Sequence, residues 1–400
     1  MHTQKKTSTP AKDTASSLGF ERKRFNYYLT SIPTMKILQA VHSFPPSQGG
    51  IEHHVYHLSR ELYALGNSVL VITTRDKGTS VQEDFAGVKV KRFFSIDFPL
   101  FSSARLPLFA FFEMLKENPD IYASHGYGSI MPLFASIAAL IKRKPFIFTL
   151  HGYPHVKGKK RIFYYFYKFF IAPVFLRIAK KIIVVSKATI PAIAKECDLK
   201  KIVYVPNGIK EVFDCESDYE KKNKIIYVGR FDDDKGIDIL IRAFAKIKKY
   251  FPELELELVG KDEGIKDRLE ALANSLNIKP TFMEVPYHEM PSVYCESKAV
   301  VLPSRYEGFS LVWLEAIASG RPIFSTPVGE APYIFEQAYG EKKGRFLFKN
   351  EDELVVKILS FLKSQKTFKK TIENAKYIIK EEYSWANVAK LTENVYKELI

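Results

Sequence analysis

Residues 224–236 read KIIYVGRFDDDKG, a short β-branched run that leads into a glycine turn and a charged loop before an amphipathic stretch begins. Residues 35–50, MKILQAVHSFPPSQGG, show the same order near the start of the chain. A strand that passes through a glycine turn into a helix is typical of the opening unit of a parallel sheet flanked by helices. The two stretches therefore predict two doubly wound, Rossmann-like α/β halves.

Short apolar runs alternate with longer amphipathic stretches from residue 35 onward, as expected for parallel strands joined by helices. Strands are expected at 36–41, 68–73, 121–124, 145–150, 181–185, 202–205, 224–228, 254–259, 281–284, 299–302 and 322–325. We predict four segments: a flexible extension at 1–34, one domain at 35–206, a second at 207–380, and a helix at 381–400 that packs back toward the first domain.

Composition excludes several classes of protein. A chain of 400 residues with 46% hydrophobic and 26% charged side chains is neither collagen-like, nor disordered throughout, nor a small disulfide scaffold. The three cysteines, Cys197, Cys215 and Cys295, lack metal-ligand spacing and predict a reduced, cytosolic compartment. The longest nearly apolar run, 162–176, falls short of the ~18 residues that cross a bilayer. We therefore expect neither a signal peptide nor a transmembrane helix.

The formal net charge of +15 is concentrated in one part of the chain. Residues 121–195 contain 13 basic and no acidic side chains, whereas the 205 residues that follow carry a net charge of −2. This distribution is unlike that of a uniformly basic protein, so nucleic acid is not an expected partner. Residues 157–181 hold eight Lys or Arg and eight Phe or Tyr. They predict a contact with an anionic membrane surface, although several of these aromatic residues are expected in the core.

The loop at residues 43–52 follows the first strand and contains the pair Gly49 and Gly50. Paired glycines let a backbone approach a ligand closely, and the helix that follows presents free amides to an anion such as a diphosphate. An ordinary strand-to-helix turn is the alternative. The chain has no GxxxxGK[ST] or GxGxxG motif, so a nucleoside triphosphatase or a dinucleotide dehydrogenase gains no support.

The corresponding loop of the second half contains Arg230 and Lys235. A guanidinium fork and an ammonium at the carboxyl end of a strand could hold a diphosphate and neutralise its charge as it leaves. Two solvated loop charges are the alternative. The acidic residues at 232–234 could instead ligate a divalent metal, but we favour their placement at the start of the next helix, and we expect no metal site.

Glu307 and Glu315 lie eight positions apart. On a helix that spacing is about 12 Å of rise, so the two carboxylates could border one cleft. Glycosidase carboxylates are about 5 to 9.5 Å apart, so a hydrolytic pair fits poorly. The span suits the sugar and the ribose of a nucleotide sugar, with backbone amides between them for the diphosphate. Those amides would come from Gly308, Phe309, Ser310 and Leu311. Two unrelated helix acids are the alternative.

The segment PSRYEGFSLVWLEAIASGRPI, residues 303–323, resembles glycosyltransferase family 4, with Glu307 and Glu315 as the E-x7-E signature of retaining glycosyltransferases. Further resemblance, in order and spacing, lies at residues 49–74, 148–155, 182–188, 205–209, 225–244 and 383–396. It implies the GT-B fold, in which two facing Rossmann-like domains form a donor cleft. The N-terminal domain would then be the acceptor side, and the C-terminal domain would bind the nucleotide sugar.

The resemblance also implies roles for individual residues. Gly50 would contact the diphosphate or the reacting sugar, Arg230 and Lys235 would hold the diphosphate, Glu307 the sugar, and Glu315 the ribose. His151, which follows a strand, matches the family's active-site histidine. The catalytic set is then His151, Glu307, Arg230 and Lys235. Glu52 and His125 are candidates for the acceptor side, with a helix-starting acid and a packed loop histidine as the alternatives.

The expected activity is retaining transfer of a sugar from a UDP-, GDP- or ADP-sugar to a glycan or lipid-linked acceptor, in cell-surface polysaccharide or glycolipid biosynthesis. No cofactor or metal would be obligatory, and the enzyme would act at the cytoplasmic face of the membrane as a peripheral protein. The chain departs from the family at residues 329–333 and at Glu284, which leaves the base and the donor open. A sugar-nucleotide epimerase and a non-catalytic binding module are the alternative functions.

Overall fold

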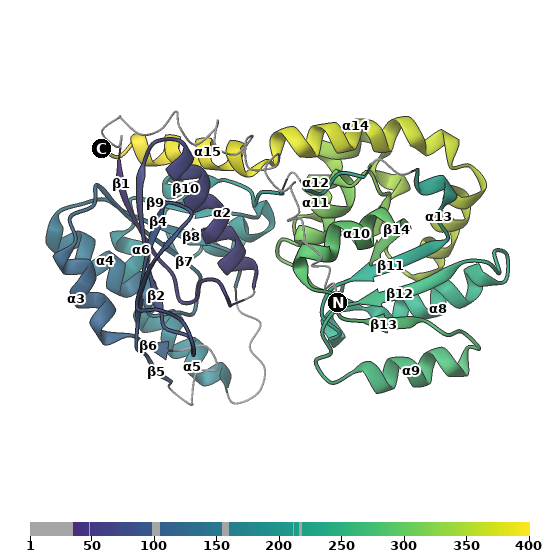
Figure 1. The fold of residues 1–400 in the computed structure, drawn as a ribbon, viewed down its shortest axis with the longest axis horizontal. Helices are drawn as coiled ribbons and strands as arrows, with labels where there is room; N and C mark the ends of the chain where they lie inside the picture. The colour runs from purple at the N-terminus through teal and green to yellow at the C-terminus, as the bar shows by residue number, and fades with distance from the viewer. Residues whose placement is uncertain (1–34, 48, 98–104, 154–159, 211, 216–217) are drawn as a thin grey trace, which may run out of the picture.

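The computed structural model describes residues 35–47, 49–97, 105–153, 160–210, 212–215 and 218–400. They form two α/β domains that lie side by side, joined by a crossing at the top of the view in Figure 1. The predicted extension at residues 1–34 lies outside the described residues. Each domain has a largely parallel sheet with helices packed against it, which confirms the predicted fold class.

The N-terminal domain has an eight-stranded sheet of order β10-β9-β8-β7-β1-β2-β4-β3, parallel except for β3. Its strands are β1 (Lys36–Ala40), β2 (Ser68–Thr74), β3 (Gln82–Phe85), β4 (Val88–Phe93), β7 (Ile121–His125), β8 (Phe146–Leu150), β9 (Lys181–Val184) and β10 (Ile202–Tyr204). The short strands β5 (Ile96–Asp97) and β6 (Arg105–Leu106) pair separately. Its helices are α2 (Gly50–Ala64), α3 (Leu108–Lys116), α4 (Met131–Lys142), α5 (Lys160–Phe166), α6 (Ala172–Ile178) and α7 (Ile190–Ile193), and the π-helical turn η1 (Tyr167–Ile171) joins α5 to α6.

The C-terminal domain has a five-stranded parallel sheet of order β13-β12-β11-β14-β15. Its strands are β11 (Lys224–Val228), β12 (Glu255–Val259), β13 (Thr281–Met283), β14 (Ser297–Leu302) and β15 (Ile323–Ser325). Its helices are α8 (Ile237–Lys248), α9 (Lys266–Ser275), α10 (Met290–Cys295), α11 (Leu311–Ala318), α12 (Ala331–Tyr339), α13 (Glu351–Lys363) and α14 (Lys366–Glu382). The strand order reverses beside β11, so ligands are expected near the loops after β11 and β14.

Strands are present at all eleven predicted positions, and the hairpin of β3 and β4 is an addition. The strand β3 lies at the edge of the sheet and contains exposed polar residues, so it lacks the apolar run that marks the other strands. In β4, the buried Val88 and Val90 alternate with the exposed Lys89 and the half-buried Lys91. Period-two alternation of this kind is a recognisable strand signal.

The last helix, α15 (Trp385–Lys397), belongs to the core of the N-terminal domain rather than to that of the domain before it. After α14 the chain crosses between the domains, and α15 packs against α2 (Figure 1). Trp385 and Val388 are buried in the same cluster as Val55 and Leu58 of α2. This apolar burial stabilises the crossing and fixes α2 relative to the end of the chain.

The structure corrects one prediction about the cysteines. Cys215 and Cys295 form a disulfide with their Cα atoms 5.3 Å apart, whereas their sequence spacing predicted three reduced thiols. The segment after β10 brings Cys215 next to the end of α10, a proximity that a separation of 80 residues does not reveal. Cys197 remains a free, half-buried thiol. In the described part of the chain, no helix is both long enough and apolar enough to cross a bilayer.

Candidate active site

The predicted site residues lie on loops and helix starts that follow strands of the two sheets. In the N-terminal domain, His125 ends β7 and His151 follows β8. In the C-terminal domain, Arg230 and Lys235 follow β11, and Glu307 follows β14. Loops of the two domains meet here, because a Cβ atom added to Gly308 would lie 3.8 Å from the carbonyl oxygen of His151.

Lys235 and Glu307 form the central ion pair of the C-terminal side. Lys235 Nζ donates to Glu307 Oε1 at 2.6 Å, and the two side chains are only 15% and 11% exposed. Ser304 Oγ donates to the same carboxylate oxygen at 3.1 Å. The helix α11 begins at Leu311, so Glu307 lies in the loop before it, and the prediction that both glutamates share one helix is wrong. The loop before α11 contains Pro303 and Gly308, which explains why it is not helical.

Arg230 lies on the rim of this site rather than within it. Its side chain is 62% exposed, and Nη2 lies 3.4 Å from Asp232 Oδ2. Asp232 also accepts a hydrogen bond from the backbone of Asp234, and Asp233 pairs with Arg268. At least two of the three acids thus have partners within the loop or on α9. An exposed guanidinium can turn toward a diphosphate at little cost in stability.

Glu315 is enclosed within the C-terminal domain. Its Oε2 accepts a hydrogen bond from Tyr294 at 2.7 Å, its Oε1 accepts one from Tyr287 at 3.0 Å, and the residue is 3% exposed. Burial raises the pKa of the Glu315 carboxyl, and the two tyrosine hydroxyls oppose that change. Tyr287 in turn contacts His53 of α2, with ring centroids 4.6 Å apart. Tyr287 therefore lies between Glu315 and α2.

The loop that carries Glu307 is supported by Gly329 and Glu330. Gly329 has φ 54°, and a Cβ atom there would lie 2.4 Å from the Glu307 carbonyl oxygen. Glu330 N donates to Gly308 O at 3.0 Å, while Glu330 Oε2 accepts a hydrogen bond from Ser186 Oγ at 2.8 Å. Ser186 belongs to the N-terminal domain, so Glu330 links the two domains. In the sequence, residues 329–333 stand out only as a departure from the family.

The glycine loop of the N-terminal domain lies before α2. Gly49 is the N-cap of α2, and a Cβ atom there would collide with the carboxylate of Glu52. Nothing lies within 4 Å of a Cβ added to Gly50. Burial raises the pKa of the Glu52 carboxyl. Arg92, fully buried, donates to the carbonyl of Pro45 and so holds the loop from behind.

His151 and His125 belong to a cluster of three imidazoles with His54 of α2. His125 Nδ1 lies 3.2 Å from His151 Nε2, and His125 Nε2 lies 2.6 Å from Gln39 Oε1. Burial lowers the pKa of all three imidazoles, that of His54 to about 4. They are therefore neutral near pH 7. His54 was missed as a site residue, since one histidine on an amphipathic helix carries no distinguishing signal.

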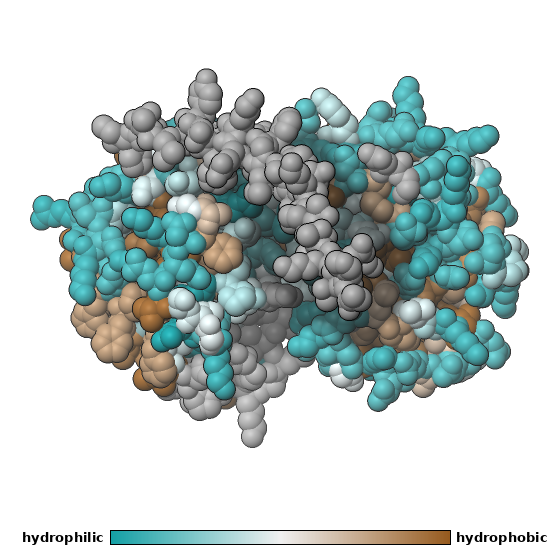
Figure 2. Space-filling view, viewed as in Figure 1, coloured by the Kyte–Doolittle hydropathy of each residue, from teal (hydrophilic) through white to brown (hydrophobic). Residues whose placement is uncertain are grey.

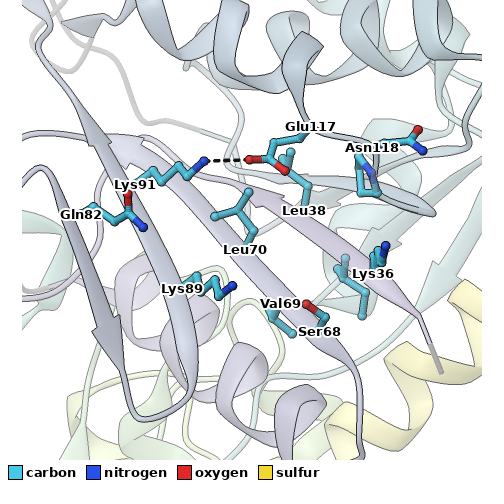
Figure 3. Close-up of a pocket in the computed structure, with 12 residues that line it drawn as sticks. Lys36, Leu38, Ser68, Val69, Leu70, Gln82, Lys89, Lys91, Glu117 and Asn118 are labelled. Atoms are coloured by element: carbon cyan, nitrogen blue, oxygen red, sulfur yellow. Dashed lines mark hydrogen bonds and ion pairs between the residues drawn. The ribbon is translucent and has the colours of Figure 1, made fainter. Parts of the chain in front are cut away.

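The cavity drawn in Figure 3 lies away from these residues. Its volume is about 230 Å³, and its lining includes Lys36 and Ser68, the first residues of β1 and β2. Lys91 and Glu117 pair across it. The cavity thus lies toward the amino ends of parallel strands, whereas ligands of such sheets bind beyond the carboxyl ends.

The two domains match two glycosyltransferase families. The family model for Glycosyltransferase Family 4 matches residues 48–211, and the model for Glycosyl transferases group 1 matches residues 209–377. The chain is a two-domain glycosyltransferase. The first model contains the glycine loop and all three clustered histidines, and the second contains the Lys235–Glu307 pair. The matches thus divide the chain where the two sheets are divided.

Curated relatives of this glycosyltransferase include an uncharacterized glycosyltransferase of Methanocaldococcus jannaschii, 32% identical over 218 residues. That alignment covers 50% of this chain and 54% of the relative, about half of each. The gpi3 subunit of phosphatidylinositol N-acetylglucosaminyltransferase from Schizosaccharomyces pombe is 26% identical over 381 residues. That alignment covers 89% of this chain and 79% of the subunit.

Among solved structures, the Anabaena protein HepE in complex with UDP-glucose superposes on the glycosyltransferase with a TM-score of 0.71. The superposition covers 91% of this chain and 100% of HepE at 20% sequence identity. A likeness at this level of identity concerns the fold, and it confirms the predicted GT-B architecture.

Proposed function

We propose that this glycosyltransferase transfers a sugar from a nucleotide-sugar donor to a glycan or lipid-linked acceptor, with retention of anomeric configuration and without an obligatory metal. The observation that carries the proposal is the Lys235–Glu307 pair, which places a cation and a carboxylate together where the loops of the two domains meet. A departing nucleoside diphosphate needs the cation, and sugar hydroxyls need the acceptor oxygens.

In the proposed reaction, Lys235 and Arg230 stabilise the charge that develops on the diphosphate as the glycosidic bond to it breaks. Backbone amides at residues 308–311 and the Gly50 backbone would bind the same group, since α11 and α2 both start beside these loops. Glu307 and His151 would hold the sugar, and Glu315 the ribose. The acceptor hydroxyl attacks from the face that the diphosphate leaves, and its proton passes to the leaving phosphate oxygen.

Exposed apolar side chains on the N-terminal domain support a lipid-linked acceptor. Tyr167 and Phe175 of this segment are buried, as expected for part of it. Six other apolar side chains on α5, η1 and α6 are exposed, namely Ile162, Tyr165, Phe166, Phe169, Phe170 and Val174. Phe169 and Phe170 are each 66% exposed. The helix α6 packs on α4, and α4 packs on α3. Phe109 and Phe112 of α3 are exposed as well, and brown side chains gather over α3 in Figure 2. Exposed apolar side chains gathered in this way are typical of an interaction surface.

We propose that this face docks on the cytoplasmic side of an anionic membrane. Part of the predicted segment, residues 157–159, lies outside the described residues, and Lys168 pairs with Glu196 at 3.0 Å. Beside that pair is a cavity of about 520 Å³ lined by Tyr153, Tyr164 and Phe169. Its aromatic wall and its position beside α5 and α6 suit the apolar part of an acceptor.

The proposal is tested by incubating the protein with UDP-, GDP- and ADP-sugars, with and without a membrane lipid extract. We expect nucleotide release with one donor class to depend on the extract, and the glycolipid product to keep the donor's anomeric configuration by NMR. Two names among the similar proteins, an N-acetylglucosaminyltransferase subunit and a UDP-glucose complex, make UDP-sugars the first donors to try. A rearranged nucleotide sugar formed without acceptor would indicate an epimerase instead.

A further inference from the structure

Three histidines from distant parts of the sequence converge at one point of the N-terminal domain. His54 comes from α2, His125 from the end of β7, and His151 from the loop after β8. Each offers one ring nitrogen, and the three nitrogens all lie within 4.8 Å of one another. Imidazoles this close share either hydrogen bonds or a metal ion.

The partners of the outer nitrogens determine where the lone pairs point. His54 Nδ1 lies 2.8 Å from the amide oxygen of Asn207, and His125 Nε2 lies 2.6 Å from the amide oxygen of Gln39. Amide oxygens only accept, so both outer nitrogens carry protons and donate. The inner nitrogens, His54 Nε2 and His125 Nδ1, therefore bear lone pairs. Metal-ligating histidines are held in this way, with the second ring nitrogen donating to a carbonyl or carboxylate.

Hydrogen bonding within the cluster leaves one of these nitrogens unused. His151 can donate from Nε2 to His125 Nδ1 across 3.2 Å. His54 Nε2 is then a fully buried acceptor without a hydrogen-bond partner. Leaving a buried acceptor of this kind unsatisfied is destabilising. A cation among the three rings would satisfy it.

We propose that His54 Nε2, His125 Nδ1 and His151 Nε2 bind one divalent transition-metal ion of the Zn²⁺ type. Zn–N bonds of about 2.0–2.1 Å in tetrahedral geometry place ligand nitrogens about 3.3 Å apart. The His125–His151 separation of 3.2 Å already has this value, and the His54 nitrogen, which lies within 4.8 Å of both, moves inward to bind the ion. Neutral imidazole is the ligating form, and the hydrogen bonds to Asn207 and Gln39 place the ring protons of His54 and His125 on their outer nitrogens.

Such a site leaves the fourth metal position to water or another ligand. His151 is the least buried of the three, and its backbone faces Gly308 of the other domain, so the open position lies toward the junction between the domains. The ion is not required for the sugar transfer proposed above. It competes with that reaction, because His151 Nε2 cannot bind the metal and the nucleotide-sugar donor at once. This consequence alone rests on the proposed function.

The test is a titration of the full-length, chelator-treated protein with Co²⁺, read by the visible absorption of tetrahedral cobalt. We expect one equivalent to bind, and His54→Gln and His125→Gln each to weaken binding by more than about 100-fold, the upper value for losing a group that only supports a ligand. His288→Gln is the matched control, because His288 is 80% exposed and lies outside the cluster; it should bind like the unmodified protein.

A second readout guards against variants that fold poorly. Zn²⁺ that binds only the folded state raises Tm, so it should raise Tm in the unmodified protein and in His288→Gln but not in His54→Gln or His125→Gln. Absence of tetrahedral cobalt absorption in the unmodified protein, or equal binding by all variants, would overturn the metal site. No sugar donor is present in either measurement, so a failure of the proposed transferase reaction would not affect them.

Discussion

Lys235 Nζ lies 2.6 Å from Glu307 Oε1, so the groups assigned to the diphosphate and to the sugar are paired with each other. Ser304 donates to the same oxygen, and Gly236 and Gly329 each pack on the backbone of the 303–310 loop with no room for a side chain. The packing of these loops therefore fixes the positions of Lys235 and Glu307 relative to each other. In the proposed reaction, a preorganised charge of this kind would stabilise the leaving diphosphate without rearrangement.

The first prediction concerns this pair. Glu307→Gln keeps the size of the side chain but removes the charge, and we expect kcat/KM for transfer to fall by about 10²–10³-fold. Lys235→Met should cause a similar loss and also lower the free energy of unfolding, since it leaves the Glu307 carboxylate half-enclosed without its cation. Steady-state kinetics and urea unfolding of both single variants and the double variant measure the two effects. Full activity in Glu307→Gln would refute the assignment.

Arg230 carries the second prediction. Because its side chain is 62% exposed, Arg230→Ala should leave the free energy of unfolding unchanged within about 0.5 kcal/mol. It should raise the KM for the nucleotide sugar about tenfold or more, since a charged hydrogen bond to the diphosphate contributes about 1.5–3 kcal/mol. Lys249→Ala, an exposed cation at the end of α8, is the control. If the two variants have equal KM values for the nucleotide sugar, Arg230 does not bind the diphosphate.

The two tyrosines on Glu315 separate a structural role from a donor-binding role. Tyr294 is fully buried, so Tyr294→Phe leaves Glu315 Oε2 without its donor and should lower the free energy of unfolding by about 1–3 kcal/mol. Tyr287 lies between Glu315 and His53 of the other domain. Tyr287→Phe should therefore change the KM for the nucleotide sugar more than it changes stability. If Tyr287→Phe instead changes the free energy of unfolding more than it changes the KM for the nucleotide sugar, the ribose does not bind beside Glu315.

The proposed membrane docking depends on exposed apolar side chains of η1. Phe169→Ser with Phe170→Ser should weaken cosedimentation with anionic phosphatidylglycerol vesicles at least tenfold, because each ring loses its burial in the interface. Val356→Ser with Tyr377→Ser removes side chains of similar exposure from the other domain and should have no effect. Binding should also fall with added salt. If the unmodified protein fails to bind these vesicles even at low salt, the docking surface is refuted.

Much of the fold could be predicted because each half begins with the same strand, turn and helix. The residues of the Lys235–Glu307 pair were also predictable, since loops that follow parallel strands meet at one edge of a sheet. Their direct contact was not, because Glu307 lies in a loop whose path depends on Gly329, 22 residues further on. The burial of Glu315 depends on Tyr287 and Tyr294, and the position of His54 depends on Asn207. These partners lie at distant positions in the sequence, and no motif spacing links them to the residues that they contact.

The last prediction concerns Glu330, which joins the domains through Ser186 Oγ at 2.8 Å and Ala188 N at 3.3 Å. Burial raises the pKa of this carboxyl above its ordinary value of 4.5, and the two hydrogen bonds only partly oppose that change. The folded protein therefore holds this proton to a higher pH than the unfolded chain does. As pH rises from about 4.5 through the folded-state pKa, Glu330 makes a progressively less favourable contribution to the free energy of unfolding.

Glu330→Gln has no proton to release and keeps an amide oxygen for Ser186. We expect its stability relative to the unmodified protein to increase from pH 4 to pH 7, as followed by urea unfolding at each pH. If Glu330→Gln instead runs parallel to the unmodified protein across this range, the carboxyl ionises at its ordinary pKa, and the link between the domains does not depend on pH.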